Sequence, residues 1–201
     1  MMIYDCSFNE HCISHIISNG GKWEPHVDEF IKDQKISGNM IDVGGDIGTF
    51  SIGNSDVFNE IYVFEPSVER FNIISDSVSR FGYSNIHPYN KAVGEKNGRG
   101  ILTTQYENQI NIQDDGDVDI ISIDSLNLEN ITFVKIDTEG FEDYVLMGML
   151  GLLKQQNPYL FIETHSTIRM ESLTKTNELL SNLGYSKILE YDCEGGIYKK
   201  L

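Results

Sequence analysis

The residues best suited to chemistry begin with a glycine-rich turn, DVGGDIG at positions 42–48. An apolar run ends in this turn, and a second apolar run, Ile61–Phe64, ends in Glu65 and Pro66. Glu65 lies 21 residues after Gly44, a spacing at which a carboxylate can bind the two ribose hydroxyls of a nucleotide-like cofactor. The turn and the acid together predict a cofactor site.

The turn departs from the dinucleotide fingerprint G-x-G-x-x-G. Asp46 takes the place of the second glycine, and a carboxylate there would repel a pyrophosphate. S-Adenosylmethionine has no phosphate, and its sulfonium and ammonium would be attracted to acids, so we favour this methyl donor over a dinucleotide used by an oxidoreductase. The donor's methionine portion is expected at the glycine turn and its ribose at Glu65. The predicted cofactor-binding residues are Asp42, Gly44, Gly45, Asp46, Gly48, Glu65 and Pro66.

A second acidic segment, FVKIDTEGFE at positions 133–142, holds further candidates. Asp137 follows an apolar run that predicts a central strand, and Glu142 opens the next helix. A later strand is predicted to end at Glu163, and His165, two residues further on, would lie on the same side of an extended chain. Because open α/β sheets bind ligands at the carboxyl ends of their strands, we expect these groups to converge near the glycine turn.

Two chemistries fit the second segment. Methyl transfer to a hydroxyl requires an aligned acceptor and removal of its proton, so Asp137, Glu163 and His165 are the predicted catalytic residues, with His165 as general base. Alternatively, Asp137, Glu163 and Glu142 hold Mg²⁺ or Mn²⁺, cations that take oxygen ligands. Glu142 could instead only favour a helix N-terminus, and His165 could be an ordinary surface histidine. Glu24 could reach the donor's amino-acid end, but we do not count it among the site residues.

Alternating strands and helices must position these residues. Residues 1–38 are predicted as a helical lead-in and 39–201 as an α/β core, within one domain over 1–201. The predicted fold is a mostly parallel sheet with helices on both faces and an antiparallel C-terminal hairpin at its edge. Strands are expected at Met40–Val43, Ile61–Phe64, Asn85–Val93, Gly100–Gln105, Thr132–Asp137, Tyr159–Thr164, Ser186–Tyr191 and Ile197–Lys200. Helices are expected at Ile47–Phe58, Val68–Phe81, Phe141–Gln155 and Glu171–Leu183.

Charge and composition restrict the partners. The 201 residues include 15 basic and 31 acidic ones, a net charge of −16 that disfavours nucleic acid and anionic membranes. Apolar runs are shorter than the roughly 20 residues of a membrane span, and the N-terminus lacks the basic cluster of a signal peptide. Three cysteines form no metal-type pair, and their odd number argues against a disulfide framework, so a cytoplasmic setting is expected. The residues indicate no particular oligomeric state.

Several motifs together resemble the FkbM-type methyltransferase family. They are DVGGDIG at 42–48, FEP at 64–66, SIDSL at 122–126, VKIDTEGFE at 134–142 and IETH at 162–165. The resemblance implies a class I methyltransferase (Rossmann-like) fold, use of S-adenosylmethionine, and methylation of a hydroxyl of a sugar, glycan or related natural product. The family's turn usually has alanine and asparagine where this chain has Gly45 and Asp46. A non-catalytic relative that binds or scaffolds in glycan assembly is the alternative.

Overall fold

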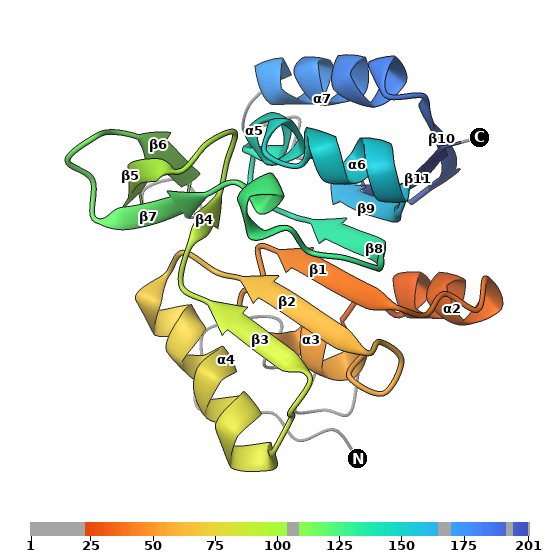
Figure 1. The fold of residues 1–201 in the computed structure, drawn as a ribbon, viewed down its shortest axis with the longest axis horizontal. Helices are drawn as coiled ribbons and strands as arrows, with labels where there is room; N and C mark the ends of the chain where they lie inside the picture. The colour runs from red at the N-terminus through yellow and green to blue at the C-terminus, as the bar shows by residue number, and fades with distance from the viewer. Residues whose placement is uncertain (1–22, 104–108, 165–169, 192–194, 201) are drawn as a thin grey trace.

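The computed structural model describes residues 23–103, 109–164, 170–191 and 195–200. These residues form a large seven-stranded sheet and a smaller four-stranded sheet beside it (Figure 1). The strands of the large sheet are β1 (Asn39–Val43), β2 (Glu60–Phe64), β3 (Ile86–Tyr89), β8 (Ile131–Ile136), β9 (Tyr159–Glu163), β10 (Tyr185–Glu190) and β11 (Gly195–Lys200).

The large sheet has the strand order β10-β11-β9-β8-β1-β2-β3. Its neighbouring strands run parallel except at β11, which is antiparallel to both β9 and β10. The predicted mostly parallel sheet with an antiparallel closing hairpin is therefore confirmed. After β1 the chain builds outward to β2 and β3, then returns to place β8 on the other side of β1. This reversal is the position at which open α/β sheets bind ligands.

Helices cover both faces of the large sheet (Figure 1). One face carries α2 (Pro25–Asp33), α3 (Thr49–Gly53) and α4 (Val68–Phe81), and the other carries α5 (Glu142–Met147), α6 (Leu150–Gln156) and α7 (Met170–Asn182). The sequence sets several of these ends. Pro25 opens α2, while the Ser67 hydroxyl accepts a hydrogen bond from the Arg70 N–H at the start of α4.

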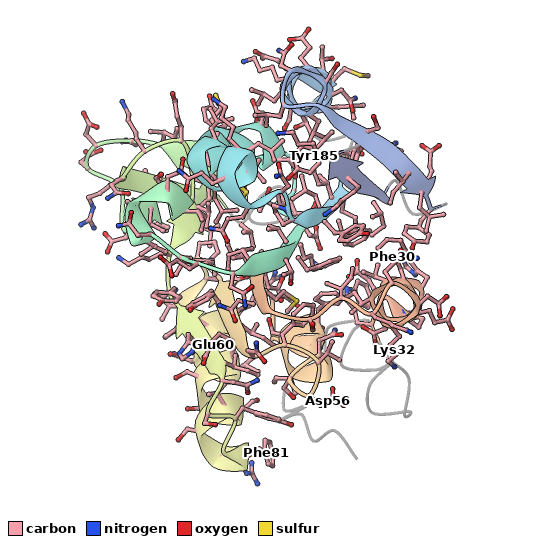
Figure 2. All side chains as sticks on the ribbon, turned by 45° about the vertical axis from the view of Figure 1, so that its right-hand side comes forward. Phe30, Lys32, Asp56, Glu60, Phe81 and Tyr185 are labelled. Carbon is pink, nitrogen blue, oxygen red and sulfur yellow. The ribbon has the colours of Figure 1, made fainter. Side chains whose placement is uncertain are left out.

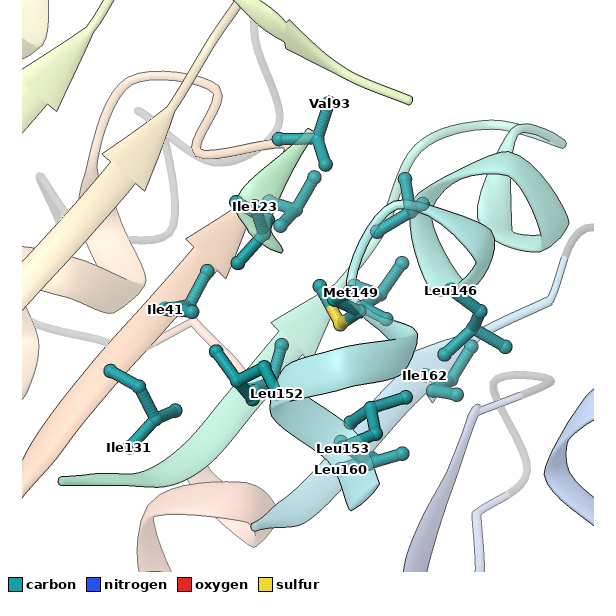
Figure 3. Close-up of a cluster of buried hydrophobic side chains, with 14 of the residues drawn as sticks. Ile41, Val93, Ile123, Ile131, Leu146, Met149, Leu152, Leu153, Leu160 and Ile162 are labelled. Atoms are coloured by element: carbon teal, nitrogen blue, oxygen red, sulfur yellow. The ribbon is translucent and has the colours of Figure 1, made fainter. Parts of the chain in front are cut away.

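Alternation along the strands divides the apolar side chains between two cores. Ile41, on β1, packs with Leu146 and Leu153 on the face covered by α5 and α6 (Figure 3). Met40, its neighbour on β1, points to the opposite face and packs in the core that includes Val27 of α2. Charged side chains such as Lys32 and Asp56 lie on the outside of the layers (Figure 2). Within the described ranges, no helix is both long and apolar enough to cross a membrane.

The predicted third strand, Asn85–Val93, is confirmed over β3 but is not continuous to Val93, because the chain turns at Asn90. The side-chain amide of Asn90 donates to the carbonyls of Glu65 and Pro66, which ends β3 at Tyr89. The chain then enters the smaller sheet, of which the sequence predicted only one strand at Gly100–Gln105. That sheet consists of β4 (Ala92–Val93), β5 (Gly98–Thr103), β6 (Gln109–Ile112) and β7 (Val118–Ile121).

Two predicted helices also differ from the structure. The helix expected at Ile47–Phe58 is limited to α3, and the one expected at Phe141–Gln155 is divided into α5 and α6 at Gly148. A Cβ atom on Gly148 would lie 2.0 Å from the carbonyl oxygen of Gly94, so this turn packs directly on the backbone that leads to the smaller sheet. Of the predicted helical lead-in, α2 is confirmed and residues 1–22 lie outside the described ranges.

Candidate active site

Three neighbouring strands place charged side chains on the same face of the large sheet. Asp42 of β1 lies directly opposite Lys135 of β8 in the strand register, and Lys135 lies opposite Phe161 of β9. Because side chains alternate along a strand, Glu163, two residues after Phe161, joins Lys135 on that face. Asp137, two residues after Lys135, follows the end of β8. The sheet therefore brings these charged groups together near its carboxyl edge.

Lys135 forms the centre of this group. Its side chain is 3% exposed, and its Nζ donates a hydrogen bond to Asp137 Oδ2 at 3.1 Å. Burial alone would lower the pKa of Lys135, but Asp137 and then Glu24, Asp42 and Glu163 raise it above its ordinary value. Sequence reasoning gave Lys135 no role. A lysine inside an otherwise apolar strand is the signal that could have identified it, since lysine is almost never fully buried unless paired.

Asp42 is fully buried beneath the glycine turn. Its Oδ2 accepts a hydrogen bond from the Ser51 hydroxyl of α3 at 2.6 Å, whereas no residue in the described ranges donates a hydrogen bond to its Oδ1. Burial raises the pKa of Asp42, against the opposing effects of Lys135 and the Ser51 hydrogen bond. One oxygen of this carboxyl group can thus accept a hydrogen bond from a bound ligand, since no described residue donates one to it.

Glu24, like Asp42, is a buried carboxyl group with unpartnered oxygens among the described residues. It precedes α2 with a left-handed backbone (φ 50°) and is 6% exposed, and neither of its carboxyl oxygens has a hydrogen-bond partner among the described residues. Burial raises the pKa of Glu24 well above its ordinary value; Lys135 opposes this shift, and Glu163, Asp137 and Asp42 increase it. Glu24 therefore belongs to the same electrostatic cluster, although the sequence analysis left it out of the site.

The glycine turn is tied to the ends of two strands. The N–H groups of Gly44 and Gly45 both donate to the Phe64 carbonyl at the end of β2. Gly44 has φ +82°, and a Cβ atom there would lie 1.7 Å from the Asp137 carbonyl oxygen. Close approach of the β8 end, rather than of a ligand, therefore requires glycine at position 44. The same packing brings the first and second acidic segments together, as the sequence predicted.

Glu65 lies where the sequence placed it, directly after β2. Its two carboxyl oxygens accept hydrogen bonds from the backbone N–H groups of Asp46 at 2.9 Å and Ser67 at 2.8 Å. Burial raises the pKa of Glu65 to about 7, although the Ser67 hydrogen bond and Arg70 act in the opposite direction. Asn90 holds the carbonyls of Glu65 and Pro66, as described above, so the loop after β2 is fixed on both sides.

Asp46 contributes to this arrangement mainly through its backbone. Its N–H holds Glu65, and its carboxylate forms an ion pair with Arg70 of α4 at 2.8 Å. The negative charge that distinguishes Asp46 from the asparagine usual in the resembling family therefore has a cationic partner within the chain. Gly48 follows and serves as the N-cap residue of α3, with φ +83°.

The predicted metal ligands do not form a common site. Glu142 is buried, and its Oε1 accepts hydrogen bonds from the Gly140 N–H and the Thr138 hydroxyl while its Oε2 accepts one from Ser172 of α7. It thus joins the loop after β8 to α7. Across the part of the chain that the structure describes, no three His, Cys, Asp or Glu side chains are grouped to hold a metal ion. His165, the predicted general base, lies outside that part.

Comparison with known proteins bears on this arrangement. Residues 24–187 match the methyltransferase FkbM domain. A crystal structure of methyltransferase FkbM from Methylobacillus flagellatus is 22% identical with a TM-score of 0.63, over 82% of this chain and 44% of that one. This chain thus spans less than half the length of that protein. No curated protein matches the sequence.

Two further solved structures share the architecture. A protein from Streptococcus mutans, described as a methyltransferase and solved with SAH, is 9% identical with a TM-score of 0.57, over 90% of this chain and 99% of that one. An rRNA methylase from Streptococcus thermophilus is 10% identical with a TM-score of 0.54, over 90% of this chain and 98% of that one. At these identities the likeness concerns the fold alone, and that fold is the class I methyltransferase fold.

Proposed function

This chain belongs to the FkbM methyltransferase family, and from that membership we propose that it transfers the methyl group of S-adenosylmethionine to a hydroxyl group. The observation that carries the proposal is the pair of buried carboxyl groups with unpartnered oxygens, Glu24 and Asp42, behind the glycine turn. A buried polar atom without a partner is costly, and such atoms in folded proteins commonly indicate a function or a missing ligand.

The site fits the donor in chemistry. S-Adenosylmethionine carries a cationic sulfonium and a cationic α-ammonium, which suit the acids behind the turn, and a ribose diol, which suits Glu65 at the end of β2. Both carboxyl oxygens of Glu65 are oriented by backbone N–H groups, and each oxygen retains a lone pair for a hydroxyl. The bound donor would supply an electrophilic methyl group. The chain's own residues would bind it, orient the acceptor and accept the acceptor's proton.

Asp137 is the residue that we assign to the acceptor side. Its side chain is 18% exposed, so it is more accessible than Lys135, whose ammonium holds it at 3.1 Å. This ion pair fixes the direction of the Asp137 carboxylate. An ionised carboxylate can accept a hydrogen bond from the acceptor hydroxyl and so align its oxygen for attack. Glu163 lies beside it, and His165 remains the predicted general base.

The acceptor that we propose is a hydroxyl of a sugar, glycan or related natural product, which rests on family membership. The net charge of −16 supports a small or weakly charged acceptor over the RNA that the Streptococcus thermophilus methylase is named for. The test is a panel of activated sugars and glycans incubated with the protein and isotopically labelled donor. Donor-dependent transfer of label to one class supports the proposal, whereas absence of transfer to every hydroxyl compound favours a non-catalytic binding role.

Asp137→Asn is the variant that examines the acceptor side. We expect donor affinity within about twofold of wild type and turnover reduced by about 10²–10⁴, because the neutral amide no longer aligns the acceptor hydroxyl through a charge-assisted hydrogen bond. Labelled methyl transfer and calorimetric donor binding measure the two effects separately. Asp56→Asn, at an exposed position after α3, serves as the control. Normal turnover by Asp137→Asn would remove Asp137 from the mechanism.

A further inference from the structure

The buried cluster around Lys135 has more acidic than basic groups. Four carboxyl groups, those of Glu24, Asp42, Asp137 and Glu163, interact electrostatically with this lysine. Lys135 directs its hydrogen bond to Asp137, and Ser51 donates to Asp42. Glu24 receives neither of these hydrogen bonds, since both of its carboxyl oxygens are buried and no described residue donates to them. The part of the chain that the structure describes therefore leaves the Glu24 carboxyl group without a hydrogen-bond donor within the candidate active site.

The backbone at Glu24 shows that this placement is specific. Glu24 is the residue before α2, and its side chain does not cap the helix. Its φ of 50° is a left-handed conformation that non-glycine residues rarely adopt. Solvent is close by, because Pro25 and Glu29 of the same segment are exposed. The chain nevertheless turns the Glu24 carboxyl group inward, toward Lys135 and Asp42.

We propose that Glu24 binds the α-ammonium group of S-adenosylmethionine, with the free oxygen of Asp42 as a second acceptor. The inference rests on the proposed function and assigns a residue to one end of the donor. An ammonium group has three N–H donors, and the unpartnered oxygens of Glu24 and Asp42 number three. The sulfonium group has no N–H and cannot satisfy them. Both groups are cationic, so hydrogen-bonding capacity selects the ammonium group at the amino-acid end of the donor.

Two ligands separate this role from a general effect on the fold. S-Adenosylhomocysteine retains the ammonium but lacks the sulfonium, and 5′-methylthioadenosine lacks the whole amino-acid end. In calorimetric titrations we expect Glu24→Gln to weaken binding of S-adenosylhomocysteine by about tenfold or more, as for loss of a charge-assisted hydrogen bond. Binding of 5′-methylthioadenosine should stay within about twofold of wild type. Glu29→Gln, on the exposed side of α2, should change neither affinity.

Each other result contradicts the inference in its own way. Unchanged affinity of Glu24→Gln for S-adenosylhomocysteine would show that Glu24 does not bind the ammonium group. An equal loss for both ligands would show that Glu24 acts through the fold of the site. Wild-type protein that binds neither ligand would instead contradict the proposed function, which keeps the two failures distinct.

Discussion

Glu65 shows how a single buried residue can connect stability to function. The fold holds its carboxyl group with two backbone N–H groups, but burial still raises its pKa from 4.5 to about 7. A neutral carboxyl group is therefore favoured in the folded state at mildly acidic pH. The carboxylate form, which accepts hydrogen bonds from a ribose diol at both oxygens, is the form that costs folding free energy.

This raised pKa predicts a pH dependence of stability. Since the folded-state pKa lies above the unfolded value, the free energy of unfolding should fall as pH rises from about 4.5 to 7 and then level off. The upper limit is about 3 kcal/mol for a difference of this size. Urea unfolding of wild type and Glu65→Gln across this range measures the effect. The fall should be smaller in the variant, in which the raised pKa values of Glu24 and Asp42 still act in the same direction, and Glu69→Gln, exposed on α4, should retain the full fall. Curves of the same shape for wild type and Glu65→Gln would contradict the assignment.

The sequence allowed part of the site to be predicted at this scale. An acid at the end of an apolar strand and a glycine turn 21 residues earlier are local patterns, and the structure joins them through the hydrogen bond from Asp46 to Glu65. The importance of Lys135 and Glu24 could not be predicted in the same way. Their environment depends on the register between β1 and β8 and on an inward turn before α2, neither of which is a local pattern.

At the scale of elements, Asp124 holds α6 from a distant part of the chain. Its two carboxyl oxygens accept hydrogen bonds from the N–H groups of Gly151 and Leu152 in the first turn of α6, at 2.8 and 2.9 Å. A negative charge at a helix N-terminus is favourable and satisfies donors that have no partner within the helix. The SIDSL segment, which the sequence analysis noted without a role, thus has a structural one.

Asp124→Ala should accordingly destabilise the fold. We expect a loss of about 1–2 kcal/mol in the free energy of unfolding, typical of removing a helix cap. Chemical denaturation monitored by circular dichroism measures it, with Asp117→Ala, exposed in the loop before β7, as the matched control. A loss no larger than that of the control would show that the cap contributes nothing.

The division between α5 and α6 also depends on contacts with a segment that is distant in the sequence. The apolar spacing over 141–155 predicted one helix, but the carbonyl of Gly148 accepts hydrogen bonds from the Asp124 N–H and the Ser122 hydroxyl. The predicted third strand ends early for a similar reason, since Asn90 contacts the loop after β2 and the chain turns there. Helices and strands with regular apolar spacing could be predicted, whereas breaks imposed by distant segments could not.

For the whole molecule, the fold brings Asp42, Glu65, Asp137 and Glu163 to the carboxyl ends of neighbouring strands in a mostly parallel sheet. The order β10-β11-β9-β8-β1-β2-β3 places β1 at the reversal of strand order, with β8 and β2 on either side. The glycine turn, Glu65 and the Lys135 cluster all follow from these three strands and β9. Family membership and this arrangement support a methyl donor with cationic groups, and the overall charge of −16 is consistent with the same preference.

Donor binding tests this account most directly. Calorimetric titration of the wild-type protein with S-adenosylmethionine should give saturable heat with a dissociation constant in the micromolar range, and Glu65→Ala should abolish it. NAD⁺ should give no heat, because its pyrophosphate would meet the acids of the glycine turn. Saturable heat with NAD⁺ and none with S-adenosylmethionine would contradict the central claim that this site is built for a methyl donor.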